Sequence, residues 1–102
     1  MLVEESMPLT RGKEQVLTTM MGVKFMMRDG DLEVACRAAR GLLRYRFGSR
    51  DSDGDEDKFK LHRQEMESAA SNKYDAGKLE AHADVTIIVT EADVASSLSR
   101  KM

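Results

Sequence analysis

Residues 23 to 37 read VKFMMRDGDLEVACR, and this stretch gives the strongest local indication of the fold. Asp29-Gly30 is typical of a two-residue hairpin turn, because both residues tolerate the positive φ angles that such a turn needs. Reversal of the chain there makes three apolar cross-strand pairs on one face: Val23 with Cys36, Phe25 with Val34 and Met27 with Leu32. An isolated hairpin is marginally stable at best. We therefore predict a β-hairpin whose apolar face is covered by another layer of the protein.

The opposite face of this hairpin is mostly charged. It carries Lys24, Met26, Arg28, Glu33 and Arg37, and Met20 shares the same parity. Methionine side chains adapt easily to different partners, so this face could be a surface for a dimer or for another protein. Scattered apolar side chains are also ordinary on protein surfaces, and both interpretations stay open.

Two helices are predicted after the hairpin. Residues 38–47 place Ala39, Leu43 and Phe47 on one helical face, and Gly48 can end this helix in the left-handed conformation. Residues 55–76 form a longer helical pattern, whose stripe consists of Phe59, His62, Met66, Ala69, Ala70 and Tyr74. Gly77 offers a stop signal.

The C-terminal part combines a strand with a short helix. The run DVTIIVT at 84–90 is rich in β-branched residues and predicts a strand. Residues 78–81 could form a short strand before it. Thr90 followed by Asp93 resembles a capping box, which predicts a final helix at 91–98.

The order of these elements predicts an α+β fold. We expect a two-layer sandwich, in which a small antiparallel sheet (the N-terminal hairpin plus a later strand or strands) is covered on one face by two helices. Residues 1–19 are expected to form a mobile tail, 20–98 a single domain and 99–102 a frayed end.

Composition agrees with one small domain, since the chain has 102 residues of which 41 % are apolar. A net charge of −2 gives no general attraction to nucleic acid or to anionic membranes. The one cysteine, Cys36, cannot form an internal disulfide, as expected in a reducing cytoplasm. No signal peptide or bilayer-spanning run is found. We expect a cytoplasmic protein without membrane contacts.

Several short motifs occur in an order that resembles a known family. They are V-x-F at 23–25, DG at 29–30, V-x-C at 34–36, LLRYRFG at 42–48, the acidic loop, F-x-x-x-R at 59–63, Ala69-Ala70, K-Y at 73–74, Gly77 and V-T-I at 85–87, before Thr90 and Asp93. From about residue 21 to 94, the chain resembles the small bacterial family called domain of unknown function 1488. It departs at Ala83, where a glycine is expected. The resemblance implies a compact α+β fold and brings no established activity or catalytic residues.

The acidic run DSDGDED is the segment most similar to an ion-binding loop. Asp51, Asp53, Asp55 and Asp57 fall at positions 1, 3, 5 and 7 of a calcium loop. Such a loop needs glycine at position 6 and glutamate at position 12, where this chain has Glu56 and His62. We therefore favour a helix start capped by Asp53 or Asp55. A weak divalent-ion site at the four aspartates is the alternative.

Five arginines precede this acidic run. Arg37, Arg40 and Arg44 follow helical spacing and could contact the phosphates of a nucleic acid. The acidic run neutralises this charge within a Debye length of about 8 Å, so pairing of the arginines with that run is favoured. Arg63 lies beside the apolar stripe, and we expect its guanidinium to pair with a carboxylate or to reach water.

Cys36, His62 and His82 show no spacing that is typical of a metal site or a nucleophile. Cys36 on the apolar face should have a raised pKa and be unreactive. We therefore expect no catalytic residues, no metal and no cofactor. The favoured function is a non-catalytic protein-interaction or accessory module, with an unknown protein or a second copy as partner. Weak nucleic-acid binding through Arg37, Arg40 and Arg44 is the less favoured alternative.

Overall fold

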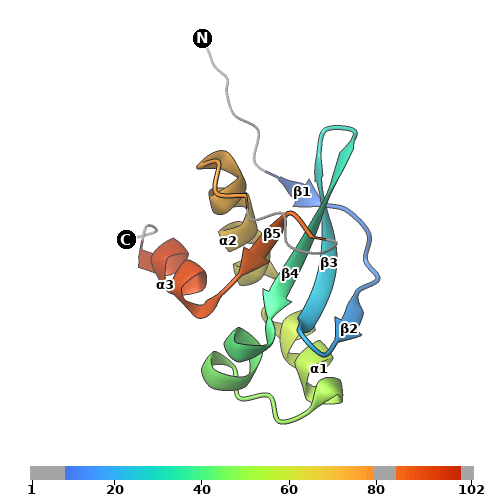
Figure 1. The fold of residues 1–102 in the computed structure, drawn as a ribbon, viewed down its shortest axis with the longest axis vertical. Helices are drawn as coiled ribbons and strands as arrows, with labels where there is room; N and C mark the ends of the chain where they lie inside the picture. Colours follow the sequence, from blue (N-terminus) through green and yellow to red (C-terminus); the bar gives the residue numbers. More distant parts are fainter. Residues whose placement is uncertain (1–8, 80–84, 100–102) are drawn as a thin grey trace.

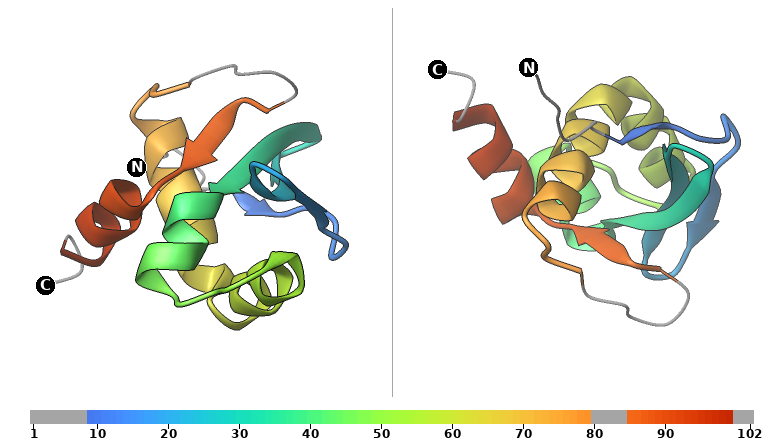
Figure 2. Two further views of the ribbon diagram at one scale, coloured as in Figure 1. Left: turned by 60° about the horizontal axis from the view of Figure 1, so that its bottom comes forward. Right: turned by 90° about the horizontal axis from the view of Figure 1, so that it is seen from above.

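A computed structural model describes residues 9–79 and 85–99 (Figure 1). The strands of its sheet are β1 (Thr10–Arg11), β2 (Leu17–Thr19), β3 (Gly22–Asp29), β4 (Leu32–Ala39) and β5 (Ile87–Val89). The helical elements are the short π-helix η1 (Leu42–Arg46), α1 (Ser52–Leu61), α2 (Arg63–Asp75) and α3 (Glu91–Ser99). Figure 2 shows α1 and α2 on one face of the sheet. The predicted α+β fold with two helices on one face is confirmed.

The sheet is mixed, which corrects the prediction of an antiparallel one. Its strand order is β1-β3-β4-β5, and β2 also pairs with β3, on the same edge as β1. Strand β5 runs parallel to β4, with Cys36 opposite Ile87. The chain passes through α1 and α2 between these two strands, and such a crossover connection is the one that returns a strand in parallel.

The β3–β4 hairpin has the predicted apolar face with a different register. Gly30 and Asp31 form the turn, and Asp29 pairs with Leu32. The observed apolar pairs are Val23 with Ala38, Phe25 with Cys36 and Met27 with Val34. Each differs from the predicted pair by two residues. Because side chains alternate with a period of two, this shift keeps the same face of each strand toward the core. Leu32, which was predicted in a buried pair, is 61 % exposed at the start of β4, and Ala38 is buried at its other end.

Residues 9 to 19 belong to the sheet and its core, so the predicted tail is wrong for this part of the chain. Leu9 is buried, and its N–H donates to the Ser71 hydroxyl at 3.0 Å. The Gly12 N–H donates to the carbonyl of Met26 at 3.0 Å and ties the chain to β3 beyond β1. Strands of two and three residues are too short to produce a periodic signal in a sequence. Residues 1–8 lie outside the described part.

The helices exist where they were predicted, with different bounds. Ala38 and Ala39 end β4, so the first helical segment begins later than residue 38. The long helix predicted at 55–76 is two helices, because His62 ends α1 and precedes α2. Gly77, with a φ of 74°, follows the end of α2 as expected.

The final helix is confirmed as α3. Asp93 accepts a hydrogen bond from the Thr90 N–H at 2.8 Å, as the capping pattern predicted, and another from the Thr90 hydroxyl at 2.9 Å. Strand β5 is shorter than the predicted run. Lys78 and Leu79 are not in a strand, and the rest of that possible strand, together with Ala83, lies outside the described residues.

The hydrophobic core fills the space between the sheet and its helices. Phe25 of β3 and Phe59 of α1 meet at its centre, with 4.9 Å between their ring centroids. The other fully buried large side chains include Val23, Met27, Cys36, Leu42, Leu43, Met66, Ile87, Val89 and Val94. In the described part of the chain, no helix covers the opposite face of the sheet, where Lys24 and Met26 are partly exposed (Figure 2).

Candidate interaction surface

Asp55 is the centre of a buried ion-pair cluster at the start of α1. The Arg44 guanidinium donates from Nε to Oδ1 at 2.9 Å and from Nη2 to Oδ2 at 3.2 Å, and the Ser49 hydroxyl donates to the same carboxylate. Burial raises the pKa of Asp55, but the hydrogen bonds from Arg44 and Ser49 and the charges of Arg44 and Arg40 outweigh it. The pKa therefore lies below its ordinary value. Asp55 joins η1 to α1 inside the protein.

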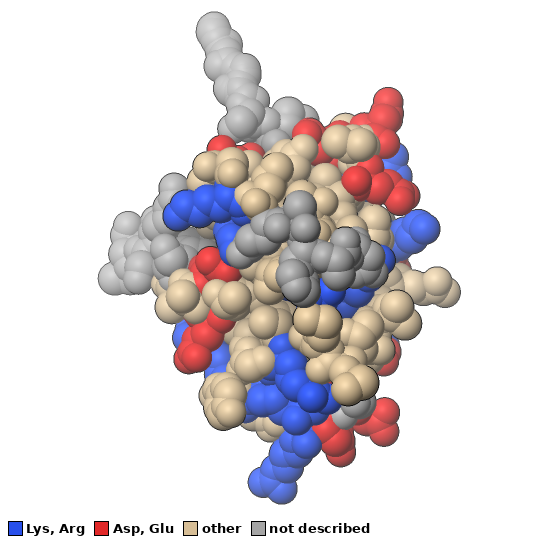
Figure 3. Space-filling model, in the orientation of Figure 1, with Lys and Arg blue, Asp and Glu red and all other residues tan. Residues whose placement is uncertain are grey.

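The three arginines predicted to contact nucleic acid do not share one helical face. Arg37 belongs to β4 and is buried, whereas Arg44 lies in η1. Arg40 Nε lies 4.0 Å from Asp55 Oδ2. Arg40 and Arg44 therefore meet at one carboxylate, and the predicted stripe is wrong because residue 37 is in a strand. Figure 3 shows basic side chains beside acidic ones at this end of the molecule, over η1 and α1.

The acidic run forms the first turns of α1. Asp51 is the N-cap residue, since its Oδ1 accepts a hydrogen bond from the Gly54 N–H at 2.7 Å. This corrects the predicted cap at Asp53 or Asp55. Within the described part of the chain, no three His, Cys, Asp or Glu side chains lie together as metal ligands would. The structure thus does not gather Asp51, Asp53, Asp55 and Asp57 around one centre.

Arg63 has the carboxylate partner that was expected of it. Its Nε donates to Glu67 Oε2 at 2.9 Å, and its two terminal nitrogens donate to the carbonyls of Lys13 and Glu14, each at 2.8 Å. The guanidinium carbon lies 5.4 Å from the centroid of the Phe59 ring. These contacts hold the chain between β1 and β2 against α2.

Cys36 and His62 lie in different surroundings. Burial, with a smaller contribution from Glu67, raises the pKa of the Cys36 thiol to about 12, as expected for a core cysteine. The His62 ring stacks on Phe47 with 4.0 Å between centroids, and its Nδ1 lies 3.3 Å from a Glu65 carboxylate oxygen. His82 lies outside the described residues.

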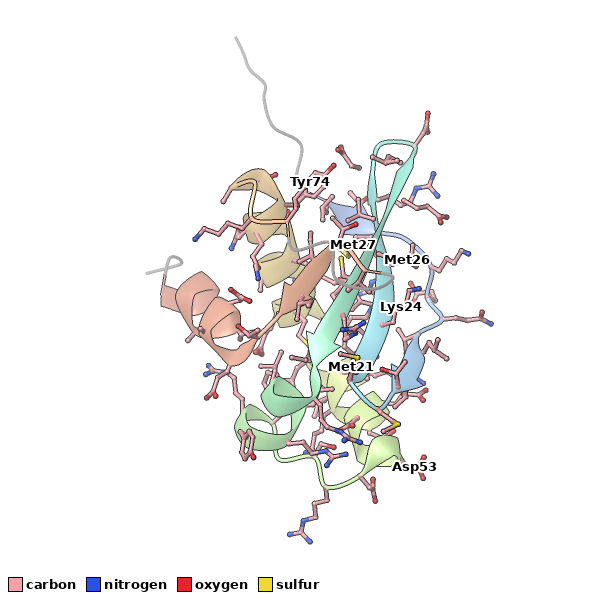
Figure 4. The ribbon with its side chains drawn as sticks, viewed as in Figure 1. Met21, Lys24, Met26, Met27, Asp53 and Tyr74 are labelled. Atoms are coloured by element: carbon pink, nitrogen blue, oxygen red, sulfur yellow. The ribbon has the colours of Figure 1, made fainter. Side chains whose placement is uncertain are left out.

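Large apolar side chains are exposed together at β2 and at the turn that follows it. Leu17 is 59 % exposed, Met20 81 % and Met21 50 %. Figure 4 places Met21 at this turn and Lys24 and Met26 along the neighbouring strand β3. Leu17 pairs with Lys24, so both side chains lie on the sheet face that carries no helix. We call these exposed residues and the two grooves beside them the edge surface.

Two grooves flank residues 13–17, the edge segment. The basic groove, of about 300 Å³, is lined by Lys13, Gln15, Val16, Leu17, Lys24 and Met26. The acidic groove, of about 410 Å³, is lined by Glu14, Gln15, Val16, Glu56 and Lys60. The grooves share Gln15 and Val16. In the acidic groove, Glu56 is paired with Lys60 at 2.9 Å, and Glu14 lies 3.4 Å from Arg11, so both glutamates have a cation nearby in the same chain.

The fold and this surface define a small α+β protein with a mixed sheet, two covering helices and an exposed apolar edge. A family model for proteins of unknown function, DUF1488, matches residues 11–88, and the chain belongs to this family. The crystal structure of a protein of unknown function from the same family, from Shewanella loihica PV-4, has a TM-score of 0.67. The two sequences are 15 % identical, and the match covers 85 % of this chain and 94 % of that one. Among curated proteins no match is found.

The edge surface was found only in part from the sequence. Met20 and Met26 were identified as a possible partner surface, whereas Leu17, Met21 and Lys13 were placed in or beside a tail. Met20 and Met21 form the two-residue connection between β2 and β3. In the sequence, the glycine that follows them was the one available sign of this second hairpin turn.

No helix in the described part of the chain has the length and apolar character needed to cross a bilayer.

Proposed function

We propose that this protein is a non-catalytic interaction module that acts in the bacterial cytoplasm and binds a protein partner through the edge surface. The observation that carries this proposal is the exposure of Leu17 in β2 and of Met20 and Met21 in the turn that follows it. Contiguous exposed apolar side chains are characteristic of protein-protein contact sites. Methionine suits such a site because its flexible side chain adapts to the partner.

The state of the reactive side chains supports a non-catalytic role. Cys36 is in the core with a thiol pKa of about 12, and Asp55 is paired with Arg44 and Ser49. His62 stacks on a phenylalanine. A catalytic site needs a nucleophile, a base and an orienting group that face a common open space, and these side chains face separate neighbours.

Nucleic-acid binding is the weaker proposal for this chain. Arg40 and Arg44 both face the Asp55 carboxylate, which offsets part of their charge. If the protein binds nucleic acid, its affinity for mixed oligonucleotides should fall steeply as salt is added. The double variant Arg40→Gln/Arg44→Gln should then reduce this salt dependence.

The proposed function is tested by chemical cross-linking and affinity capture with the full chain. The double variant Leu17→Ser/Met20→Ser should lose the cross-linked species of the wild type, because it removes the apolar contacts. The matched control is Leu32→Ser/Leu79→Ser, which changes two leucines that are 61 % and 50 % exposed elsewhere. This control should keep the cross-linked species. Absence of any wild-type complex, with itself or with another protein, would overturn the proposal.

A further inference from the structure

We propose that Met20 and Met21 form an oxidation site, at which a peroxide converts the two thioethers to sulfoxides and so weakens binding at the edge surface. The effect on binding rests on the proposed function, whereas the oxidation does not. Two features of the molecule support this site: the unequal exposure of its methionines, and the way in which the turn between β2 and β3 is held.

The methionines that the structure describes differ sharply in exposure. Met20 and Met21 are exposed in the turn after β2, where Figure 4 shows Met21. Met26 is partly buried on β3, whereas Met27 and Met66 are fully buried in the core. A peroxide must contact the sulfur, so a core methionine reacts only when the protein opens. Among these five side chains, oxidation should therefore begin at the turn.

The reaction transfers one oxygen atom from the peroxide to sulfur. With hydrogen peroxide, a sulfur lone pair attacks one oxygen, so that an S–O bond forms and the O–O bond breaks. The second oxygen leaves as water with both protons. Sulfur loses two electrons and the peroxide gains them. The product is a polar sulfoxide in place of an apolar thioether.

The turn does not use the thioethers for its hydrogen bonds. The Thr19 hydroxyl donates to the carbonyl of Gly22 at 3.1 Å and accepts from the Met21 N–H at 3.1 Å. The Met21 carbonyl accepts from the Arg40 N–H at 3.1 Å. These bonds involve main-chain atoms of Met21 and leave its sulfur out. Oxidation should thus change the surface of the turn and leave the fold in place.

Sulfoxides at this turn would change the part of the edge surface that the proposed function uses. Leu17, Met20 and Met21 are its exposed large apolar side chains. Oxidation makes two of these three polar, and a polar group that is buried in an interface without a hydrogen-bond partner is unfavourable. A peroxide would therefore weaken the complex without unfolding the protein, whichever protein the partner is.

Peptide mass spectrometry of the full chain after brief treatment with hydrogen peroxide tests the site. Trypsin cleaves after lysine and arginine, so Met20 and Met21 appear together in peptide 14–24 and Met66 appears in peptide 64–73. Peptide 14–24 should gain oxygen at least about tenfold faster than peptide 64–73, because the core must open before Met66 reacts. In concentrated guanidinium chloride the two rates should become similar. Equal rates in the native protein would overturn the oxidation site.

Circular dichroism of the oxidised chain tests whether the fold is kept. The spectrum and the melting temperature should stay close to those of the untreated protein when both methionines of the turn carry oxygen. Unfolding at this stage of oxidation would overturn the proposal, because the turn would then depend on its thioethers.

The effect on binding is tested by cross-linking the oxidised chain as described for the proposed function. The oxidised wild type should lose its cross-linked species. Met20→Leu/Met21→Leu keeps the turn apolar without sulfur, so the yield of its cross-linked species should not change with peroxide. The matched control is Met66→Leu, the same replacement in the core, and it should respond to peroxide as the wild type does.

Two results distinguish this proposal from the proposed function. A wild-type complex that survives oxidation of Met20 and Met21 would overturn the effect of peroxide on binding and keep the proposed function. A chain that forms no complex before oxidation, but gains oxygen first at the turn, would overturn the proposed function and support the oxidation site.

Discussion

At the scale of single residues, buried charges decide how the segments of this chain are held together. Arg63 uses one guanidinium to bind a carboxylate on its own helix and two carbonyls of the edge segment. Asp55 uses one carboxylate to bind η1 and the loop that follows it. An arginine and an aspartate predict ion pairs at these two positions, because a buried charge without an opposite charge is strongly unfavourable. Pairing of the arginines with the acidic run was predicted, and Arg44 with Asp55 is such a pair. The carbonyls of Lys13 and Glu14 could not be predicted as partners of Arg63, because they are 50 and 49 positions away.

Replacement of Arg63 should destabilise the protein strongly. Arg63→Ala is expected to lower the free energy of unfolding by about 3 kcal/mol, because it leaves the carbonyls of Lys13 and Glu14 without this donor and removes one of the two arginines that bind Glu67. Urea denaturation monitored by circular dichroism measures this change. Arg46→Ala, at an exposed arginine, is the control and should change the stability by less than about 0.5 kcal/mol. Equal effects of both substitutions would contradict this account.

Asp55 should make the stability fall in acid. Its pKa is lower in the folded protein than its ordinary value of 3.8, so the unfolded chain binds the proton more tightly. The ionised carboxylate therefore stabilises the fold above about pH 4, and this contribution is lost as the pH falls further. The melting temperature of the wild type should drop more steeply between about pH 5 and pH 3 than that of Asp55→Asn.

The control for this prediction is Asp53→Asn, which changes an exposed aspartate of the same helix. Its melting temperature should follow the wild-type curve against pH. Parallel curves for the wild type and Asp55→Asn would show that Asp55 has no role in the acid response.

At the scale of elements, the alternation of apolar and polar residues in β3 and β4 predicted which face of the hairpin is buried. The position of the turn determines which residues of the two strands pair. Asp29-Gly30 indicated a turn at the right place, but the chain reverses over Gly30 and Asp31. A displacement of the turn by one residue changes each pair by two positions and keeps the same face of each strand toward the core, although Leu32 becomes exposed beside the turn. The helix predicted at 55–76 is divided into α1 and α2 at His62. The apolar residues keep their helical spacing through His62, so this spacing gave no indication of the break.

The two glycines that bound β3 should respond very differently to alanine. At Gly22, φ is 137° and an added Cβ would lie 2.0 Å from the carbonyl oxygen of Ala38, so backbone would have to move. At Gly30, φ is 63° and nothing lies within 4 Å of an added Cβ. We expect Gly30→Ala to cost about 1 kcal/mol from its backbone conformation alone, and Gly22→Ala to cost at least about 3 kcal/mol. Thermal unfolding compares the two, and a larger loss for Gly30→Ala would refute the assigned hairpin geometry.

At the scale of the whole molecule, the sheet and its helices enclose one core that must open before its interior reacts. Cys36 reports this opening, because it is fully buried and its thiol pKa is raised to about 12 by burial. The thiol is therefore protonated at pH 8, and only the thiolate reacts quickly. The elevated pKa also means that the stability should fall as the pH rises above about 9, since the unfolded chain ionises first.

Labelling of Cys36 by a thiol reagent at pH 8 should be at least about a hundredfold slower in the folded protein than in the unfolded chain. The rate should rise with urea in step with unfolding measured by circular dichroism. The same chain in concentrated guanidinium chloride supplies the unfolded reference. Rapid labelling without denaturant would contradict the packing of β4 against the helices.

Local patterns in the sequence were enough to predict the α+β class, the β3–β4 hairpin with its buried face and the final capped helix. Each of these depends on neighbours within a few positions, and alternation, helical spacing and capping are local patterns. Contacts between distant segments were needed to show that residues 10–11 and 17–19 join β3, that β5 lies parallel to β4, and that Arg63 binds the carbonyls of Lys13 and Glu14. These contacts join distant segments whose own patterns are too short or too polar to predict a partner, and they form because the core brings the segments together.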